Sequence, residues 1–171
     1  MPLHAATAFL FFNKGGITQN LIHGLKYKKK KNNGLFLGSL FGNDLSKSEL
    51  FKDADLLIPV PLHPKKQHKR GYNQSELIAR GMETSMNAKL NTTILKRVVF
   101  TKSQTKKSRF ERWENVKDIF HWESPEELKG KHIILVDDVI TTGATMEACL
   151  QHLIEIPDVK ISVAAIAYSQ V

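Results

Sequence analysis

The chain has 171 residues, of which 42% are hydrophobic and 25% charged, and its formal net charge is +8. This length suits one domain with a packed core and leaves little room for two, so we expect a single domain over residues 1–171. The composition excludes a wholly disordered chain, a collagen and a fibrous repeat protein. The apolar run Ala8–Phe12 is far shorter than the roughly 20 residues that cross a bilayer. One cysteine, Cys149, allows neither an internal disulfide nor a cysteine zinc site, and we expect a cytoplasmic protein.

The positive charge is concentrated towards the N-terminus. Residues 1–75 hold 12 Lys and Arg against 4 Asp and Glu, whereas residues 76–171 hold 13 of each. The run Lys28–Lys31 lies at the centre of the surplus. Such a surplus implies an anionic partner, and composition leaves open whether this is a nucleic acid, a membrane surface or a phosphorylated substrate.

Apolar spacing and turn residues predict the elements in chain order. A helix is expected from Ile17 to Tyr27, a chain break at 32–34, and a second short helix from Leu35 to about Gly42. Then follow a strand at 55–60, a helix capped by Asn73 with Glu76 as capping-box partner, strands at 94–100, 120–122, 133–136 and 159–168, a loop at 101–115 and a helix at 145–156. Strands that alternate with helices favour a parallel sheet with helices on both sides.

Residues 133–145 read Ile-Ile-Leu-Val-Asp-Asp-Val-Ile-Thr-Thr-Gly-Ala-Thr. A strand buried on both faces delivers Asp137 and Asp138 to the sheet edge at which open α/β folds bind ligands. The threonine hydroxyls, Gly143 and the start of a helix form a cradle for an anion. Because carboxylates accept hydrogen bonds from vicinal hydroxyls, the segment suits a ligand with a ribose diol and a phosphate a few ångströms away.

A Walker B pair or a phosphoacceptor site is the alternative interpretation of the two aspartates, with the threonines as an ordinary helix cap. A Walker B pair needs a GxxxxGK[ST] loop elsewhere in the chain, and the sequence contains none. We therefore favour the sugar-phosphate site.

This segment resembles the phosphoribosyl pyrophosphate (PRPP) signature of type I phosphoribosyltransferases. The resemblance implies an α/β fold in which helices flank a parallel sheet, with a small N-terminal hood. It implies that Asp137 and Asp138 hold the ribose hydroxyls during catalysis. The 5′-phosphate would be wrapped by five consecutive residues, Thr141, Thr142, Gly143, Ala144 and Thr145.

Residues 59–64 and 70–74 resemble the PVPLHP-like loop and the RGxNQ motif of the ComF and GntX branch of that family. By position, the family's pyrophosphate loop would be formed by Pro61, Leu62 and His63, and Arg70 would also bind PRPP. The alternative is a proline-rich turn with a solvated basic face. A metal site at His63 and His68 is not expected, because carboxylate partners are absent from this segment.

Residues 104–116 resemble the branch's flexible loop, which closes over PRPP and supplies cations to the leaving pyrophosphate. The resemblance implies that Arg109 and Arg112 are catalytic and that Lys106 and Lys107 bind PRPP. A solvated basic loop is the alternative for each of these four cations.

The element Leu25-Lys26-Tyr27 is similar to an LKY-like element near the N-terminus of the branch. The lysines after it are interpreted as a solvated loop or as a strip that contacts a phosphate backbone. Many members begin with a cysteine-rich zinc module. This sequence has no such cysteines, so we expect the module to be absent here, either because this member lacks it or because it has been trimmed from the N-terminus.

The resemblance implies transfer of a phosphoribosyl group from PRPP, or from another phosphorylated ribose ligand, to an unidentified acceptor with release of pyrophosphate. Mg²⁺ is the implied cofactor, bound through PRPP and not directly by the protein. The alternative function is that of a non-catalytic ComF-type competence protein that binds single-stranded DNA, which the net charge favours. No membrane partner is expected, and an oligomer is compatible with the sequence.

Overall fold

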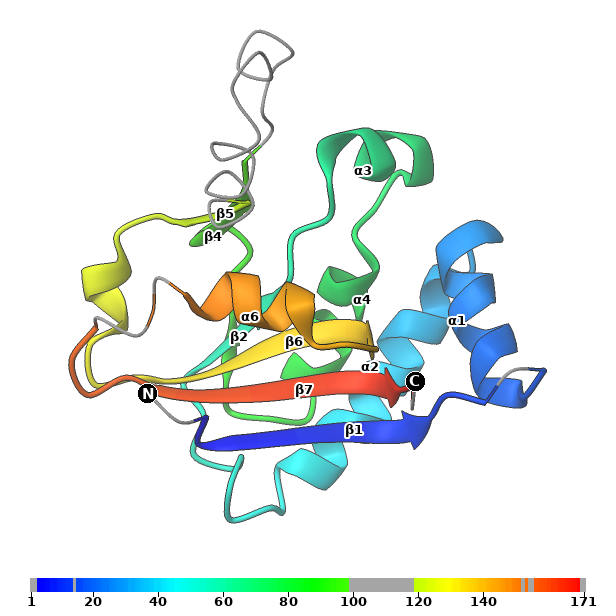
Figure 1. Ribbon diagram of the computed structural model, residues 1–171. Coiled ribbons are helices and arrows are strands. Elements are labelled where there is room, and N and C mark those ends of the chain that lie inside the picture. The colour runs from blue at the N-terminus through cyan, green and yellow to red at the C-terminus, as the bar shows by residue number, and fades with distance from the viewer. Residues whose placement is uncertain (1–2, 14, 99–118, 152, 154–155, 170–171) are drawn as a thin grey trace, which may run out of the picture.

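The computed structural model describes residues 3–13, 15–98, 119–151, 153 and 156–169. In these residues five parallel strands form one sheet in the order β1–β7–β6–β2–β3 (Figure 1). The strands are β1 (Ala5–Phe11), β2 (Leu56–Pro59), β3 (Lys89–Leu90), β6 (His132–Ile140) and β7 (Lys160–Tyr168). The parallel α/β sheet expected from the sequence is therefore confirmed.

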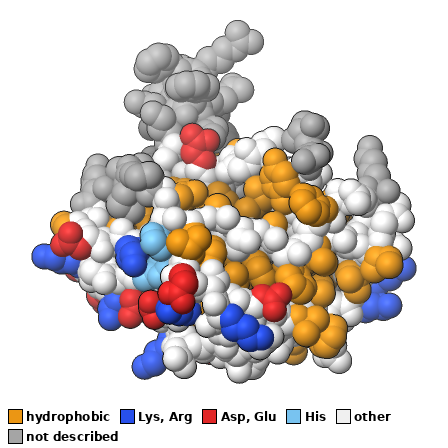
Figure 2. All heavy atoms as spheres, turned by 90° about the horizontal axis from the view of Figure 1, so that it is seen from below, with side chains coloured by type: hydrophobic (Ala, Val, Ile, Leu, Met, Phe, Trp, Pro, Cys, Tyr) orange, Lys and Arg blue, Asp and Glu red, His pale blue; other side chains and the backbone are white. Residues whose placement is uncertain are grey.

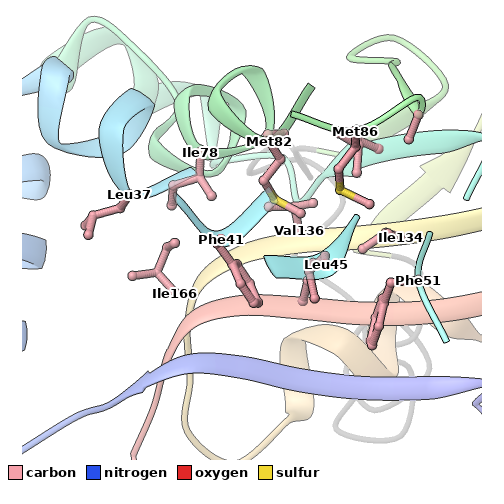
Figure 3. Packing of buried hydrophobic residues seen from close by; sticks show 14 of the residues in the cluster. Leu37, Phe41, Leu45, Phe51, Ile78, Met82, Met86, Ile134, Val136 and Ile166 are labelled. Carbon is pink, nitrogen blue, oxygen red and sulfur yellow. The ribbon is translucent and has the colours of Figure 1, made fainter. Parts of the chain in front are cut away.

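Helices lie on both faces of the sheet (Figure 1). One face is covered by α1 (Ile17–Tyr27), α2 (Lys31–Leu45) and α4 (Gln74–Glu83), and apolar side chains of α2 and α4 pack there against β6 and β7 (Figure 3). The other face carries α6 (Ala144–Leu150) and the antiparallel ribbon of β4 (Leu95–Arg97) and β5 (Phe120–Trp122). Each face of the sheet has its own hydrophobic core, and alternate residues of β6 contribute to them. Ile134 and Val136 pack on the first face, and Ile133 and Leu135 pack on the second.

The remaining described elements are α3 (Pro64–Arg70), which follows β2, and a 3-10 turn at Pro125–Leu128. The indole Nε1 of Trp122 donates to the carbonyl of Cys149 at 2.9 Å and so joins the ribbon to α6. Cys149 is fully buried, and burial raises the pKa of its thiol far above the ordinary range. No helix among the described residues is both long and apolar enough to cross a membrane.

The contact between α2 and α4 explains a wrong prediction. Residues 32–34 were expected to break the chain, but they form the first turns of α2, which begins at Lys31. The glycines of α2 permit an unusually close approach to α4: a Cβ added at Gly38 or at Gly81 would lie under 3.0 Å from backbone atoms of the other helix. Gly34, which was expected to break the chain, also lies against α4, since a Cβ added there would meet Leu77 at 3.0 Å.

Other differences from the expected elements also have tertiary causes. The strand β1 and the helix α3 were not expected from the sequence. The helix predicted at 145–156 ends at Leu150, because the N–H groups of Leu153 and Ile156 bond to carbonyls only three residues back. Met146 and Leu153 are nevertheless buried.

The strand β1 forms one edge of the sheet and carries no charged side chain. Seen from below, the molecule shows a face on which hydrophobic side chains gather between scattered charges (Figure 2). Charged residues on an edge strand commonly prevent pairing with other chains, and β1 lacks that protection.

We predict that Gly81→Ala lowers the free energy of unfolding by about 3 kcal/mol, because the new methyl group must displace backbone of α2. Urea unfolding of the two proteins measures the loss. Gly24→Ala in α1 is the matched control, since its added Cβ meets flexible side chains at 3.3 Å. Equal effects of the two variants would show that the α2–α4 contact tolerates separation.

Candidate functional site

The carboxylates of Asp137 and Asp138 lie near the carboxyl end of β6, the central strand of the sheet. The strand was expected to end at Val136, but it continues because β7 pairs with it as far as Tyr168. The two acids therefore lie within a strand, where Asp137 is only 9% exposed and Asp138 only 4%. Two neighbouring buried carboxylates are costly unless they have partners, and those partners define the site.

Two hydrogen bonds hold Asp137. Its Oδ1 accepts from the hydroxyl of Ser75 at 2.9 Å and from the backbone N–H of Asp138 at 2.8 Å. Burial, followed by the neighbouring charge of Asp138, raises the pKa of Asp137 to about 7, although the hydrogen bonds and Lys26 act against the rise. Near neutral pH this side chain is divided between its protonated and ionised forms.

The start of α4 positions Ser75. The Oδ1 of Asn73 accepts from the N–H of Ser75 at 3.1 Å, and its Nδ2 donates to the carbonyl of Val60 at 3.0 Å. Asn73 thus caps α4 as predicted, and it also joins the helix to the segment after β2. Glu76 differs from its expected capping-box role, because its carboxylate pairs with Arg80 at 2.7 Å.

An ion pair compensates Asp138. The Nζ of Lys26, near the end of α1, lies 2.8 Å from its Oδ2. The Asp138 side chain is 5% exposed and the Lys26 side chain 25%, so the pair lies at the boundary between core and solvent. The sequence did not reveal this contact, because a lysine on a short helix gives no signal of a partner in a strand far along the chain.

The RGxNQ motif fastens α1 in place. The hydroxyl of Tyr72 donates to the carbonyl of Leu25, the residue before Lys26. The guanidinium of Arg70 lies 5.8 Å from the ring centroid of Tyr27 and donates to the Oε1 of Gln74. These contacts give Arg70 and Tyr72 a common part in the placement of Lys26.

The turn after β6 is open to solvent. Thr141, Thr142, Ala144 and Thr145 are exposed, and the backbone N–H of Ala144 bonds to the Oγ1 of Thr142 at 3.4 Å. Gly143 has a φ of 80°, a left-handed conformation that favours glycine. Together with side chains of β1, β7 and α6, Thr142 and Gly143 line a cavity of about 520 Å³.

The loop after β2 lies at the same edge of the sheet, since β2 pairs with β6. The N–H of Val60 donates to the carbonyl of Val136 at 2.9 Å and extends this pairing towards the loop. Pro61, Leu62 and His63 are half-buried. The Nδ1 of His63 accepts from the N–H of Lys65 at 3.1 Å and caps α3.

The structure thus places most of the expected site residues at one end of the sheet. The aspartate pair lies near the carboxyl end of β6 and the threonine turn follows that strand, while the loop 61–63 follows the neighbouring strand β2. Lys106, Lys107, Arg109 and Arg112 lie outside the described residues. Among the residues that are described, no three His, Cys, Asp or Glu side chains converge as metal ligands.

Comparison with known proteins gives concordant matches. A family model described as phosphoribosyl transferase domain matches residues 76–169. Competence protein F of Haemophilus influenzae is 36% identical over 104 residues, which are 60% of this chain and 45% of that protein. DNA utilization protein YhgH of Salmonella typhimurium is 29% identical over 137 residues, which are 78% of this chain and 60% of that protein. The chain therefore spans about half the length of these curated relatives.

A solved structure also matches. A crystal structure of a Thermus thermophilus protein aligns with a TM-score of 0.45 and 16% identity, over 79% of this chain and 83% of that one.

We predict that Asp137 makes stability fall as the pH rises from about 4 to about 7. Its pKa in the folded state lies above the ordinary value of 3.8, so the folded protein holds a proton that the unfolded chain loses. This contribution is complete below pH 4 and lost as the pH passes 7. Asp137→Asn keeps a neutral side chain, and its stability relative to the wild type should rise over this interval.

Urea unfolding at pH 4, 5.5 and 7 measures the difference. Asp53→Asn, which removes an exposed carboxylate, is the control. Parallel curves for the wild type and Asp137→Asn would contradict a raised pKa at this position.

Proposed function

Because the chain belongs to the phosphoribosyl transferase domain family, we propose that it binds PRPP, or another phosphorylated ribose, at the aspartate pair and the threonine turn. The curated relatives place it in the competence-protein branch. The observation that carries the proposal is the pairing of two buried carboxylates with an exposed hydroxyl-rich turn that begins three residues later.

The two parts of the site suit the two parts of the ligand. Asp138 and Asp137 accept hydrogen bonds from the ribose hydroxyls, which carboxylates bind more strongly than neutral acceptors do. The exposed hydroxyls of Thr141, Thr142 and Thr145 donate to the 5′-phosphate. The left-handed Gly143 has open space where a side chain would stand, so backbone N–H groups of the turn remain accessible to an oxyanion.

The proposed reaction is transfer of the phosphoribosyl group. The bond between C1 of the ribose and the pyrophosphate oxygen breaks, the electron pair leaves with pyrophosphate, and the acceptor bonds to C1 and loses a proton to solvent. Positive charge develops on the ribose, where Asp137 and Asp138 stabilise it. Negative charge develops on pyrophosphate, which the loop 61–63 and the cations Lys106, Lys107, Arg109 and Arg112 would stabilise.

Mg²⁺ fits this site as an ion carried by the ligand. Asp138 is engaged by Lys26 and Asp137 by Ser75, so the oxygens of PRPP would supply most of the hard donors that Mg²⁺ prefers. Bound there, Mg²⁺ would shield the charge of the diphosphate.

We predict that the double variant Asp137→Asn/Asp138→Asn weakens PRPP binding at least about 100-fold, because neutral amides replace one ionised and one partly ionised carboxylate that accept hydrogen bonds from the ribose. Calorimetry in the presence of Mg²⁺ measures the affinity. Asp44→Asn/Asp53→Asn removes two exposed carboxylates and is the matched control. Affinity for PRPP that survives in the site variant would refute the proposed site.

Turnover is tested separately. Pyrophosphate release is measured with PRPP, Mg²⁺ and a panel of nucleobases, amines and ammonia as acceptors. Release that depends on one acceptor, and that is lost in the double variant, supports transfer. Binding of PRPP without release for any acceptor would favour a binding role.

The second candidate function is non-catalytic binding of single-stranded DNA. The four lysines Lys28–Lys31 are exposed, and beside them Tyr27 is 69% exposed. Cations with a neighbouring aromatic ring are the combination by which proteins hold a single strand. One relative is named a competence protein and another a DNA utilization protein.

We predict that replacement of Lys28–Lys31 by Gln weakens binding of single-stranded DNA. The salt dependence should also weaken: the negative slope of log binding constant against log salt concentration should become less steep by about 3, because four phosphate contacts are lost. Fluorescence anisotropy at several salt concentrations measures both quantities. The control replaces four exposed lysines elsewhere, Lys52, Lys89, Lys129 and Lys160. Equal losses in both variants would show that net charge alone, and not this strip, governs binding.

A further inference from the structure

A basic pocket of about 310 Å³ lies between the end of α1 and helix α3. Its lining residues come from both helices and from the segment after α1: Lys26, Tyr27, Lys29, Lys66, Lys69 and Arg70. Five of these six side chains are cationic, and none is acidic. Cations from separate elements thus converge on one hollow.

Four of the five cations have no acidic partner within the described part of the chain. The ion pairs found there include Lys26 but neither Lys29 nor the cations of α3. Arg70 donates to the neutral amide of Gln74 and lies over the ring of Tyr27. Uncompensated like charges around a hollow create a positive potential that attracts a multiply charged anion.

Lys26 belongs both to this pocket and to the aspartate pair. Its Nζ lies 2.8 Å from Asp138, while its side chain also lines the pocket and is one-quarter exposed. The group that Asp138 binds and the group in the pocket are therefore neighbours. The negative carboxylate of Asp138 and the positive pocket beside it suit a ligand that carries hydroxyls at one end and linked phosphates at the other.

We propose that the basic pocket binds the diphosphate of the phosphoribosyl ligand and that Lys26 exchanges partners, from Asp138 in the free protein to the diphosphate in the complex. This inference rests on the proposed function, because it assumes that ribose hydroxyls reach Asp138. It makes Lys26 a specificity-determining residue for diphosphorylated over monophosphorylated ribose.

The exchange follows from charge balance. Without ligand, Asp138 is buried and needs the ammonium of Lys26, since an unpaired buried charge is strongly destabilising. Ribose hydroxyls that donate to the same Oδ2 of Asp138 compete with that ammonium. A diphosphate offers the displaced ammonium a new anionic partner, whereas ribose 5-phosphate offers none at this position.

The form of the pocket favours a compact diphosphate over a nucleic-acid strand. A strand is bound by cations that follow the direction of its backbone. Here the cations surround a single hollow, and Lys28, Lys30 and Lys31 of the lysine run are not part of its lining. Binding of a nucleic-acid strand in the pocket instead of a diphosphate would contradict the proposal.

The experiment titrates inorganic pyrophosphate, ribose 5-phosphate and PRPP into the full chain by calorimetry at pH 8.5 with Mg²⁺. Lys69→Gln removes one cation of the pocket, and Lys65→Gln removes an exposed lysine of the same helix that does not line it. Lys26→Met removes the shared ammonium. Lys26→Gln, which can still donate a hydrogen bond to Asp138, serves if Lys26→Met proves unstable by thermal unfolding.

We expect Lys69→Gln to weaken pyrophosphate and PRPP binding at least tenfold and Lys65→Gln to leave both unchanged. We expect Lys26→Met to weaken PRPP at least tenfold while ribose 5-phosphate binds at least as tightly as to the wild type. Equal effects of Lys69→Gln and Lys65→Gln, or parallel losses of PRPP and ribose 5-phosphate in Lys26→Met, overturn the proposal. So does a wild-type protein that binds no pyrophosphate.

Two further outcomes separate the related hypotheses. The wild type could bind pyrophosphate through Lys69 but bind neither PRPP nor ribose 5-phosphate. In that case the proposed function is wrong, and so is the exchange of partners by Lys26. The pocket would still be a site for anions. If Lys69→Gln weakens single-stranded DNA binding and leaves pyrophosphate affinity unchanged, the pocket belongs to a nucleic-acid surface and the diphosphate assignment is wrong.

Discussion

Two carboxylates buried at successive positions of β6 impose the main electrostatic constraint on this molecule. Asp138 is balanced by the ammonium of Lys26, and Asp137 is held by a hydroxyl and by a backbone N–H while its pKa rises to about 7. Removing one partner of a buried ion pair typically costs about 3–5 kcal/mol. The end of α1 must therefore stay close to the carboxyl end of β6, and contacts from neighbouring elements hold it in that position.

The motif between α3 and α4 joins the parts that meet this requirement. Tyr72 holds the end of α1, Asn73 ties the start of α4 to the chain after β2, and Ser75 reaches Asp137. The close contact of α2 with α4 then fixes the segment that follows α1. Binding chemistry and packing are therefore not separable here, because the same few residues support the helices and orient the charges.

The sequence predicted the features that are encoded locally. The central strand, its aspartates and the open turn were found because an apolar run, an acidic pair and a glycine with threonines are adjacent in the chain. The sequence did not predict the features that depend on contacts between residues far apart in the chain. Residues 32–34 belong to α2, where Gly34 packs closely against Leu77 of α4, and the role of Lys26 depends on a strand far along the chain.

The pairing of β1 with β7 has a consequence for the order in which the chain can assemble. Within this sheet β1, the first strand in chain order, lies beside β7, the last, with Ala5 opposite Ser162 and Phe11 opposite Tyr168. During synthesis β1 must wait, without its hydrogen-bonding neighbour, until β7 has emerged. Contacts of such long sequence separation form slowly and leave an apolar segment unprotected in the meantime. Assembly of this sheet is therefore completed by β7, its last strand in chain order.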